Sequence, residues 1–349
     1  MRRGPRNTAR LSHQRRETLG FALAVASLVV LFVVAFSSGR FPVSFGDLLR
    51  LLWSKISGAP SDLSETVETV IFKVRGPRVL ASMAVGATLA AAGAAYQGLF
   101  RNPLVSPDIL GVSSGAALGA VLGIYFSLGV VGIQLLAFAV GLGAVALVYL
   151  IGASLRHHDP ILILVLAGVV IGTLLGSCVG LIKYVADPYN QLPAITFWLL
   201  GSLTAITASD LWSILPAITV GLVPLYLLRW RMNLMTLGEE EAQALGVDTR
   251  RTRFAIVSGA TLMTAAAVSV SGIIGWIGLL IPHFARLLVG PDFGRLLPAA
   301  MLLGAGYLLA VDTLARTIAN IEVPLGVLTA FIGTPFFIWL LAASRRGWH

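Results

Sequence analysis

Charged residues and cysteine are both scarce in this chain of 349 residues. Aspartate, glutamate, lysine and arginine together make up 12% of the sequence, whereas hydrophobic residues make up 57%. This shortage of charge excludes an ordinary soluble fold and indicates an all-α polytopic membrane protein. The single cysteine, Cys178, lies inside an apolar run, so a framework of disulfides is excluded as well.

Ten apolar runs predict transmembrane helices, since a crossing helix needs about 20 predominantly apolar residues. The segments between them are too short to hold a folded domain. We therefore expect residues 19–349 to form one membrane domain behind a basic tail at residues 1–18. The predicted spans are Leu19–Phe36, Val79–Tyr96, Ile109–Phe126, Val130–Leu155, Ile161–Ile182, Leu211–Leu228, Phe254–Ser271, Ile273–Leu288, Leu296–Leu314 and Val323–Leu341.

The net charge of +9 is distributed as a topology signal rather than as a nucleic-acid surface. Six arginines precede the first span, and positive charge of this kind stays on the cytoplasmic side of a membrane. Ten crossings return the C-terminus, with Arg345 and Arg346, to the same side. We therefore expect both termini in the cytoplasm and no nucleic-acid partner.

The sequence also lacks the residues that would let this chain drive transport by itself, either by ATP hydrolysis or by proton coupling. Its only lysines are Lys55, Lys73 and Lys183, and none follows a glycine, so the Gly-Lys-Ser/Thr of a Walker A loop is missing. Within the predicted spans the only acidic residue is Asp312, and Arg316, four residues later, lies on the same helix face. This spacing predicts an Asp–Arg pair rather than a proton relay. A polytopic chain with neither device needs an external motor.

The longest predicted cytoplasmic loop, residues 229–253, contains a short helix, EEEAQAL, between Gly238 and Gly246. Its apolar residues are too few to form a core, so we expect the loop to pack against the membrane domain or in a partner's groove. A plain solvated loop is the alternative. These apolar residues are Leu234, Met235, Leu237, Ala242, Leu245 and Val247.

Three arginines lie at the predicted outer face: Arg75 and Arg78 before the second span, and Arg316 at the end of the ninth. They are either interface anchors or exposed contacts for a partner. Between the first two spans, FGDLLRLLWSKI predicts an amphipathic helix. A weak similarity between residues 85–94 and 258–267 indicates either an inverted repeat or chance.

Seven motifs in a fixed order carry a resemblance to a known family. They are RGPR at Arg75–Arg78, LFRNPLVSPDILGVSSGAALG, FWLLGSL, MNLMTLGEEEAQALGVD, GIIGWIGLLIPHFARLLVGPD, DTLAR at Asp312–Arg316 and PLGVLTAFIGTPFFIWLL. From Arg75 to the C-terminus, the chain resembles the permease subunits of bacterial ABC importers for iron–siderophores, haem and cobalamin, which are the FecCD type. The N-terminal tail and the segment from Ser37 to Lys73 carry none of the motifs on which the resemblance rests.

The resemblance implies the partners of this chain. It implies a homodimer of ten-helix subunits in the bacterial inner membrane and two cytoplasmic ATPase subunits, which bind ATP and Mg. A periplasmic binding protein would deliver the cargo. This chain itself would be no enzyme and would bind no cofactor or metal.

The resemblance also assigns residues to three sites. Arg75, Arg78 and Arg316 would meet acidic residues of the binding protein. Two turns, the second of which lacks the small hydroxyl residues of some members, would narrow the cytoplasmic mouth: Asn102, Pro103, Leu104 and Asp159, Pro160, Ile161. Contacts with the ATPase would come from Leu237, Gly238, Glu239, Glu240, Glu241, Ala242, Leu245 and Gly246.

Two other functions stay open at this point. A secondary transporter is disfavoured by the lack of intramembrane charge. A passive channel or scaffold is disfavoured because no ring of charges or carbonyl groups is evident. For the cargo of an importer, the YQGLFRNPL and FWLLGSL motifs favour haem, then a ferric siderophore, then cobalamin.

Overall fold

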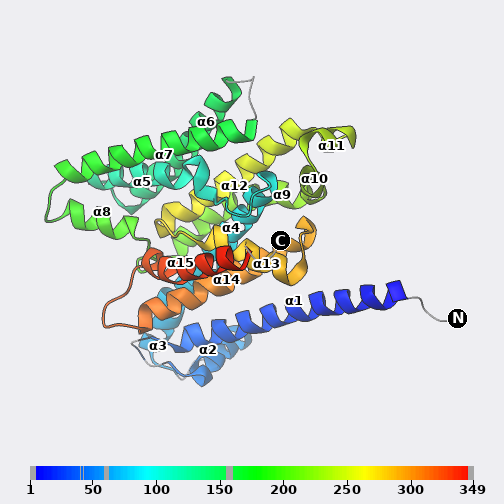
Figure 1. Ribbon diagram of the computed structural model, residues 1–349. Coiled ribbons are helices and arrows are strands. Elements are labelled where there is room, and N and C mark those ends of the chain that lie inside the picture. The colour runs from blue at the N-terminus through cyan, green and yellow to red at the C-terminus, as the bar shows by residue number, and fades with distance from the viewer. Residues whose placement is uncertain (1–4, 40, 42, 59–62, 155–159, 345–349) are drawn as a thin grey trace.

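A computed structural model describes residues 5–39, 41, 43–58, 63–154 and 160–344, and this part of the chain is helical without a strand. Its helices, labelled in Figure 1, lie roughly along one direction and form a single bundle. The elements are α1 (Pro5–Ser37), α2 (Phe45–Ser57), α3 (Glu65–Thr69), η1 (Val70–Arg75), α4 (Gly76–Leu99), η2 (Pro107–Leu110), α5 (Val112–Tyr125), α6 (Val130–Ser154), α7 (Pro160–Val185), α8 (Gln191–Leu199), α9 (Ala208–Leu227), α10 (Arg229–Met235), α11 (Glu239–Ala244), α12 (Thr249–Ser271), α13 (Ile277–Val289), α14 (Phe293–Thr317) and α15 (Leu325–Ser344).

Each of the ten predicted spans coincides with a helix. Seven helical segments of the described chain are long and apolar enough to cross a membrane, while α5, α13 and α15 are shorter apolar helices. The prediction of an all-α membrane protein is therefore confirmed. Ten crossings, the side on which each terminus lies and the inverted repeat stay predictions.

The two ends of the bundle differ in what they carry. Helices α10 and α11 and the start of α1 lie at one end, on the right in Figure 1. The helix α8 and the connection between α14 and α15 lie at the other. We call these the α11 end and the α8 end; in the predicted topology the α11 end is cytoplasmic.

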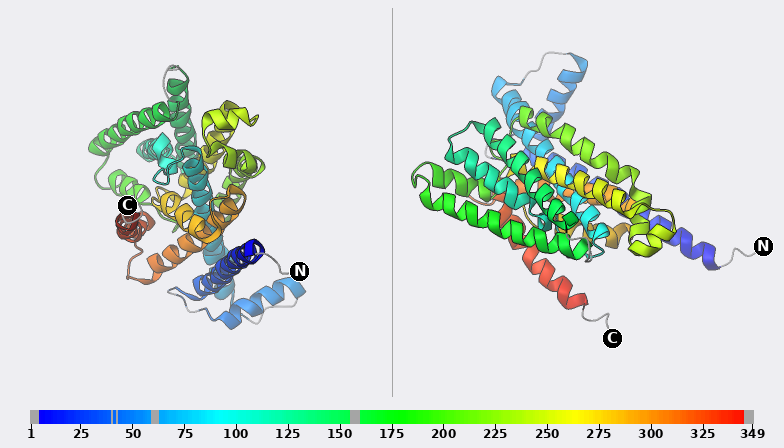
Figure 2. Two further views of the ribbon diagram at one scale, coloured as in Figure 1. Left: turned by 45° about the vertical axis from the view of Figure 1, so that its right-hand side comes forward. Right: turned by 90° about the horizontal axis from the view of Figure 1, so that it is seen from above.

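Helix α4 lies at the centre of the bundle, with α12, α13 and α14 packed around it (Figure 2). Its small residues allow this, because a Cβ atom added at Gly86 would lie 2.2 Å from the Gly304 carbonyl oxygen of α14. A Cβ atom at Gly93 would lie 2.0 Å from the Gly278 carbonyl oxygen of α13. Backbones thus touch backbones here, as small residues permit in membrane bundles. Most residues of α4 are buried as a result.

The helix that contains α4 begins earlier than the predicted start of its span at Val79, since α3, η1 and α4 are continuous from Glu65. A π-helical turn at η1 precedes Pro77, and the Gly76 amide donates to the Ile71 carbonyl five residues back. Proline lacks an amide hydrogen and its ring crowds the preceding turn, and one wide turn accommodates both. The π turn therefore lets the helix continue through the two arginines.

One side of the bundle exposes apolar side chains on α7 and α15. Helices α7, α8 and α15 lie along the same side in the left view of Figure 2. On α7, Val170 and Leu174 are exposed, and on α15, Phe331 and Ile338 are exposed. Apolar faces of this kind require lipid or another protein surface.

Candidate functional site

An ion-pair cluster at the α8 end brings together residues from the start of α4 and the end of α14. The Arg78 Nε and Nη2 atoms meet Asp312 Oδ1 at 2.9 and 2.8 Å. The Arg78 Nη1 atom meets both carboxylate oxygens of Glu322, at 3.0 and 3.1 Å. Arg316 shares Asp312, with its Nε atom 3.2 Å from Oδ2. The predicted Asp312–Arg316 pair is therefore confirmed. Arg78, however, contacts Asp312 through two side-chain nitrogen atoms, whereas Arg316 contacts that carboxylate through one.

The other guanidinium groups of the cluster hold the C-terminal end of α1. Arg75 donates to the carbonyl oxygens of Phe36 and Phe41. Arg316 donates to the carbonyl oxygens of Ala35 and Ser38, each at 3.2 Å. The last carbonyls of a helix lack partners within the helix and carry partial negative charge, so two cations stabilise this end. We call Arg75, Arg78, Arg316, Asp312 and Glu322 the arginine cluster.

Burial of the arginine cluster differs from what the sequence indicated. The Arg75 and Arg78 side chains are buried, that of Arg316 is largely buried, and Asp312 is 0% exposed. The expectation of exposed rim charges is therefore wrong. Buried cations need hydrogen-bonded anions or carbonyl groups, and the fold supplies both. Whether these arginines meet a binding protein stays a prediction.

Glu322 and Thr204 complete the cluster, and sequence reasoning missed both. The Glu322 side chain is 31% exposed and accepts a hydrogen bond from the Thr204 hydroxyl. Burial alone would raise the pKa of this carboxyl, but the hydrogen bonds from Arg78 and Thr204 outweigh burial and hold the pKa below its ordinary value. Thr204 directly follows the FWLLGSL motif and Glu322 lies two residues before the PLGVL motif, and this was the only available signal.

The loop at residues 229–253 folds as two short helices, α10 and α11, against the membrane domain. Met232, Met235, Ala242 and Val247 are buried and belong to the main hydrophobic core. Leu237 and Leu245, by contrast, are 58% and 56% exposed. The alternative of a plain solvated loop is wrong. The loop is anchored by one apolar face and presents two leucines outward.

The three glutamates of α11 do not share one environment. Glu239 Oε2 lies 2.7 Å from the buried Arg253 Nη2, and Glu239 Oε1 accepts from Thr249 at 3.0 Å. Glu240 and Glu241 are exposed. Gly238, which precedes them, has φ 144°, a backbone conformation that favours glycine. One glutamate thus fixes the helix to α12, and two face outward.

Asn233 of α10 ties this loop to the start of α14. Its side-chain amide donates to Asp292 Oδ1 at 2.9 Å, while its carbonyl oxygen accepts from the Phe293 amide at 2.8 Å. Asp292 caps α14 by accepting from the Gly294 amide. The hydrogen bond from Asn233 lowers the pKa of the Asp292 carboxyl below its ordinary value.

The turn after α4 lies at the α11 end. The Asn102 side chain accepts a hydrogen bond from the Leu104 amide at 2.9 Å, and Pro103 lies between them. The Leu104 side chain is exposed. Of the second predicted turn, Asp159 lies outside the described residues, and α7 begins at Pro160, followed by Ile161.

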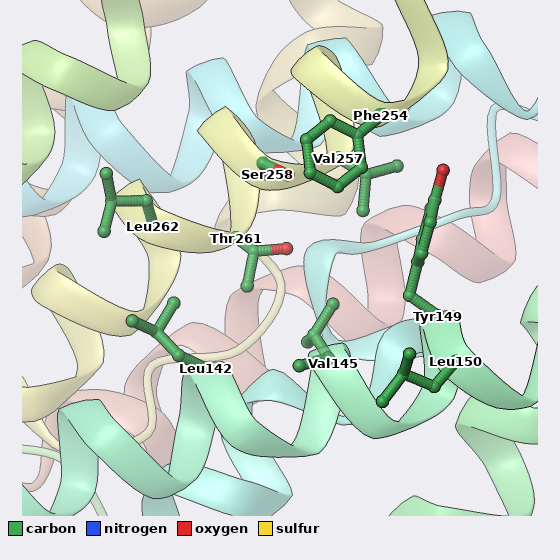
Figure 3. A pocket seen from close by; sticks show the side chains of 10 residues that line it. Leu142, Val145, Tyr149, Leu150, Phe254, Val257, Ser258, Thr261 and Leu262 are labelled. Carbon is green, nitrogen blue, oxygen red and sulfur yellow. The ribbon is translucent and has the colours of Figure 1, made fainter. Parts of the chain in front are cut away.

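A cavity of about 490 Å³ lies between α6 and α12 (Figure 3). Its walls are mostly apolar, with Leu142, Val145 and Tyr149 on one side and Phe254 and Leu262 on the other. No charged residue lines it. The cavity therefore holds no carboxylate, histidine or lysine that could act as a catalytic acid or base. Among the described residues as a whole, no group of three or more possible metal ligands occurs.

A polytopic helical bundle with an anchored loop and no nucleotide-binding motif defines the permease class of membrane transport proteins. The comparisons identify the family: the FecCD transport family matches residues 27–343, and this chain belongs to it. It is a permease of an ABC importer and a multi-pass protein of the inner membrane. Its relatives are permease subunits rather than enzymes.

Relatives with different named cargoes are about equally similar to this chain. The hemin transport permease HmuU of Yersinia pestis is 39% identical over 345 residues, covering 95% of this chain and 97% of the relative. The molybdate import permease MolB of Haemophilus influenzae is 39% identical over 321 residues, covering 92% and 94%. The cobalamin import permease BtuC of Halobacterium salinarum is 44% identical over 278 residues, covering 79% and 74%.

A solved structure supports the same fold. It is described as an inward-facing conformation of a transporter assigned to the metal-chelate type of ABC transporters. Its chain is 37% identical to this one, with a TM-score of 0.83 over 93% of this chain and 99% of that chain.

Proposed function

We propose that this chain imports an iron complex, with haem as the first candidate, from the periplasm to the cytoplasm. It works by alternating access as a homodimer, together with two ATPase subunits and a periplasmic binding protein. The ATP and Mg are bound by the ATPase partners. The observation that carries this proposal is the loop at residues 229–253 in a member of the FecCD family.

The loop has the properties of a coupling element. Its inward face is part of the main core, so a push on the loop is transmitted to α12 and α14 rather than lost in a flexible segment. Its outward face offers Leu237 and Leu245 beside the exposed Glu240 and Glu241. An apolar pair with an acidic border suits a groove on an ATPase that carries basic residues at its rim.

The homodimer is supported by the apolar side of the bundle that α7 and α15 form. A second copy related by a twofold axis would cover both faces. The turns Asn102–Leu104 and Asp159–Ile161 would then narrow the cytoplasmic mouth between the two copies. The exposed Leu104 suits an apolar constriction of this kind.

The arginine cluster is proposed as the docking point for the binding protein, at the periplasmic face of the predicted topology. Arg78 supplies the contact that a partner carboxylate can reach, because its Nη1 atom faces the partly exposed Glu322. Arg75 and Arg316 fix the structure around this contact by holding the C-terminal end of α1. Arginine suits this role because its planar group meets carboxylates bidentately.

Cargo is the finer part of the proposal. The haem preference rests on the YQGLFRNPL and FWLLGSL motifs and on the similarity to a hemin permease along nearly the whole chain. Cobalamin and a ferric siderophore are the alternatives.

The test is import into vesicles that hold the permease and its ATPase, with ATP enclosed and the cognate binding protein on the side that α8 faces. We expect haem to accumulate, and ferric siderophore, cobalamin and molybdate to accumulate less. Import without ATP that an uncoupler abolishes would instead establish a secondary transporter. Accumulation of another cargo would overturn the haem assignment alone.

A further inference from the structure

One edge of the Arg78 guanidinium group is buried against Asp312, while its remaining nitrogen atom, Nη1, faces a partly exposed carboxylate. Its Nε and Nη2 atoms face Asp312, which is 0% exposed and also holds Arg316. Its Nη1 atom faces Glu322, whose side chain is 31% exposed. Only the second carboxylate can be reached from solution without opening the bundle.

The charges of the arginine cluster do not balance. Three guanidinium groups face two carboxylates, and among the described residues the partners of Arg75 are carbonyl groups. Removing Glu322 would leave Asp312 as the one anion of the cluster beside three cations. Because a buried cation is stabilised by a paired anion, the position at Arg78 Nη1 favours an acid. Within a single chain, Glu322 is that acid.

Glu322 lies in the exposed connection between α14 and α15. The residues directly before it, from Ile318 to Ile321, are exposed, and the Val323 amide next to it donates to the Ala315 carbonyl at 3.2 Å. The side chain of Glu322 has two recorded partners, Arg78 and Thr204. Directly after it the backbone is fixed again, since the Leu325 amide donates to the Gly201 carbonyl and the Gly326 amide to the Leu200 carbonyl. A carboxylate on such a segment can leave Arg78 without disturbing the helices on either side.

We propose that Glu322 is an internal substitute for an acidic residue of the docking partner. On docking, a partner carboxylate takes the Nη1 position of Arg78, and Glu322 is released together with its segment. This inference rests on the proposed docking of a binding protein at this face. It adds that docking is an exchange of one ion pair for another, so Glu322 sets an upper limit on how tightly the partner binds.

The exchange predicts a gain of affinity from removing a charge. The experiment uses the full-length permease with its ATPase in lipid nanodiscs and the purified binding protein, and it measures the dissociation constant and the association rate. Glu322→Gln keeps the shape and the hydrogen bond to Thr204 but competes less well for Arg78. We expect the binding protein to dock about fivefold more tightly, the factor that corresponds to an exposed ion pair.

The matched control is Glu65→Gln. Glu65 begins α3 at the same end of the bundle, is exposed and forms no ion pair with the residues that the structure describes, so the change in charge is identical. We expect it to alter docking less than twofold. A thermal unfolding curve of each variant shows whether its fold is kept. An equal gain in both variants would overturn the inference, because the effect would then come from net charge alone.

A second measurement follows the segment itself. A spin label at Ile321→Cys, in a chain whose Cys178 is replaced by Ala, reports the mobility of this exposed position. We expect docking to raise this mobility in the wild-type background, because Glu322 is released. An unchanged or reduced mobility on docking would contradict the exchange.

Failure of the inference and failure of the docking proposal give different results. Weaker docking of Glu322→Gln would show that Glu322 itself contacts the partner, which overturns the exchange and keeps the surface. Unchanged docking in Glu322→Gln, combined with loss of docking when acids of the binding protein are reversed to lysine, also rejects only the exchange. If neither set of substitutions nor the salt concentration alters the dissociation constant of the binding protein, the proposed docking surface itself is rejected.

Discussion

The two ends of this protein hold their charged residues in opposite ways. At the α8 end, Arg78 and Asp312 are buried and bonded to each other through two guanidinium nitrogen atoms. At the α11 end, Glu240 and Glu241 are exposed, and only Glu239 has a buried cation as its partner. Both groups of charges stand out in the sequence as motifs. The comparison teaches that a charged motif marks a site without telling whether its charges are used inside the fold or on its surface.

The largest expected effect comes from breaking the buried side of this comparison. Replacing Asp312 with Ala leaves Arg78 and Arg316 without their shared anion, and losing one partner of a buried ion pair costs about 3–5 kcal/mol. We expect Asp312→Ala to lower strongly the yield of folded permease and its thermal unfolding midpoint. As the control, Arg251→Ala breaks an exposed ion pair with Asp248, keeps the Asp248 cap of α12 and should cost less than about 1 kcal/mol. Equal losses in the two variants would contradict the distinction.

A smaller effect is expected from separating the glutamates of α11. Glu239→Lys places a second cation beside the buried Arg253, and we expect a loss of stability of about 1–3 kcal/mol. The double variant Glu240→Lys with Glu241→Lys should leave the unfolding midpoint unchanged and reduce co-purification with the ATPase. Unfolding curves and pull-down yields check the two expectations. ATPase binding that survives the double variant would remove these glutamates from the proposed contact.

The tie between α10 and α14 sets a third, more modest prediction. Asn233→Ala removes the hydrogen bond to Asp292 and the one from the Phe293 amide, each worth about 1 kcal/mol, and frees the loop from α14. The pKa of Asp292 is lowered in the folded state, so its contribution to stability is present above the ordinary value of 3.8 and is lost as the pH falls through the lowered value. Unfolding midpoints measured from neutral to acidic pH should therefore fall less steeply in Asn233→Ala than in the wild type.

Ionic strength should give the smallest effect and the most direct test of the comparison. Salt screens exposed charges and screens buried ones much less. We expect added salt to weaken the association of the ATPase with the α11 end, while the unfolding midpoint, which depends on the arginine cluster, changes little. Titration of sodium chloride during pull-down and during thermal unfolding measures both. A midpoint that falls as steeply as the association would show that the cluster is open to solvent.

Local patterns were sufficient to predict the helices. Apolar runs predicted a helix at each of ten positions, and the glycines at 238 and 246 predicted α11, because hydropathy and helix ends depend on neighbouring residues. The Asp312–Arg316 pair was predicted for the same reason, since the two residues are one helical turn apart. What could not be predicted was the pairing of Arg78 with Glu322, which lies 244 positions away and contacts it only because α4 and α14 pack together.

The exposure of individual side chains also could not be predicted from the sequence. Arg75 before a span looks the same whether it faces lipid headgroups, a partner or the end of α1, and only the position of α1 decides this. The π turn at η1 depends on how Pro77 is accommodated within a longer helix, which no local pattern shows. Tertiary packing decided both.

Helix α4 connects the two ends that this comparison separates. It begins at the arginine cluster and ends beside the Asn102 turn, about 36 Å away at 1.5 Å per residue for its 24 residues. Where it crosses α13 and α14, carbonyl oxygens lie directly against glycine backbones, at Gly93 with Gly278 and at Gly86 with Gly304. Close-packed backbones leave little room for gradual repacking. We therefore expect a shift imposed on Arg78 at one end of the bundle to reach the opposite end as a movement of the whole helix.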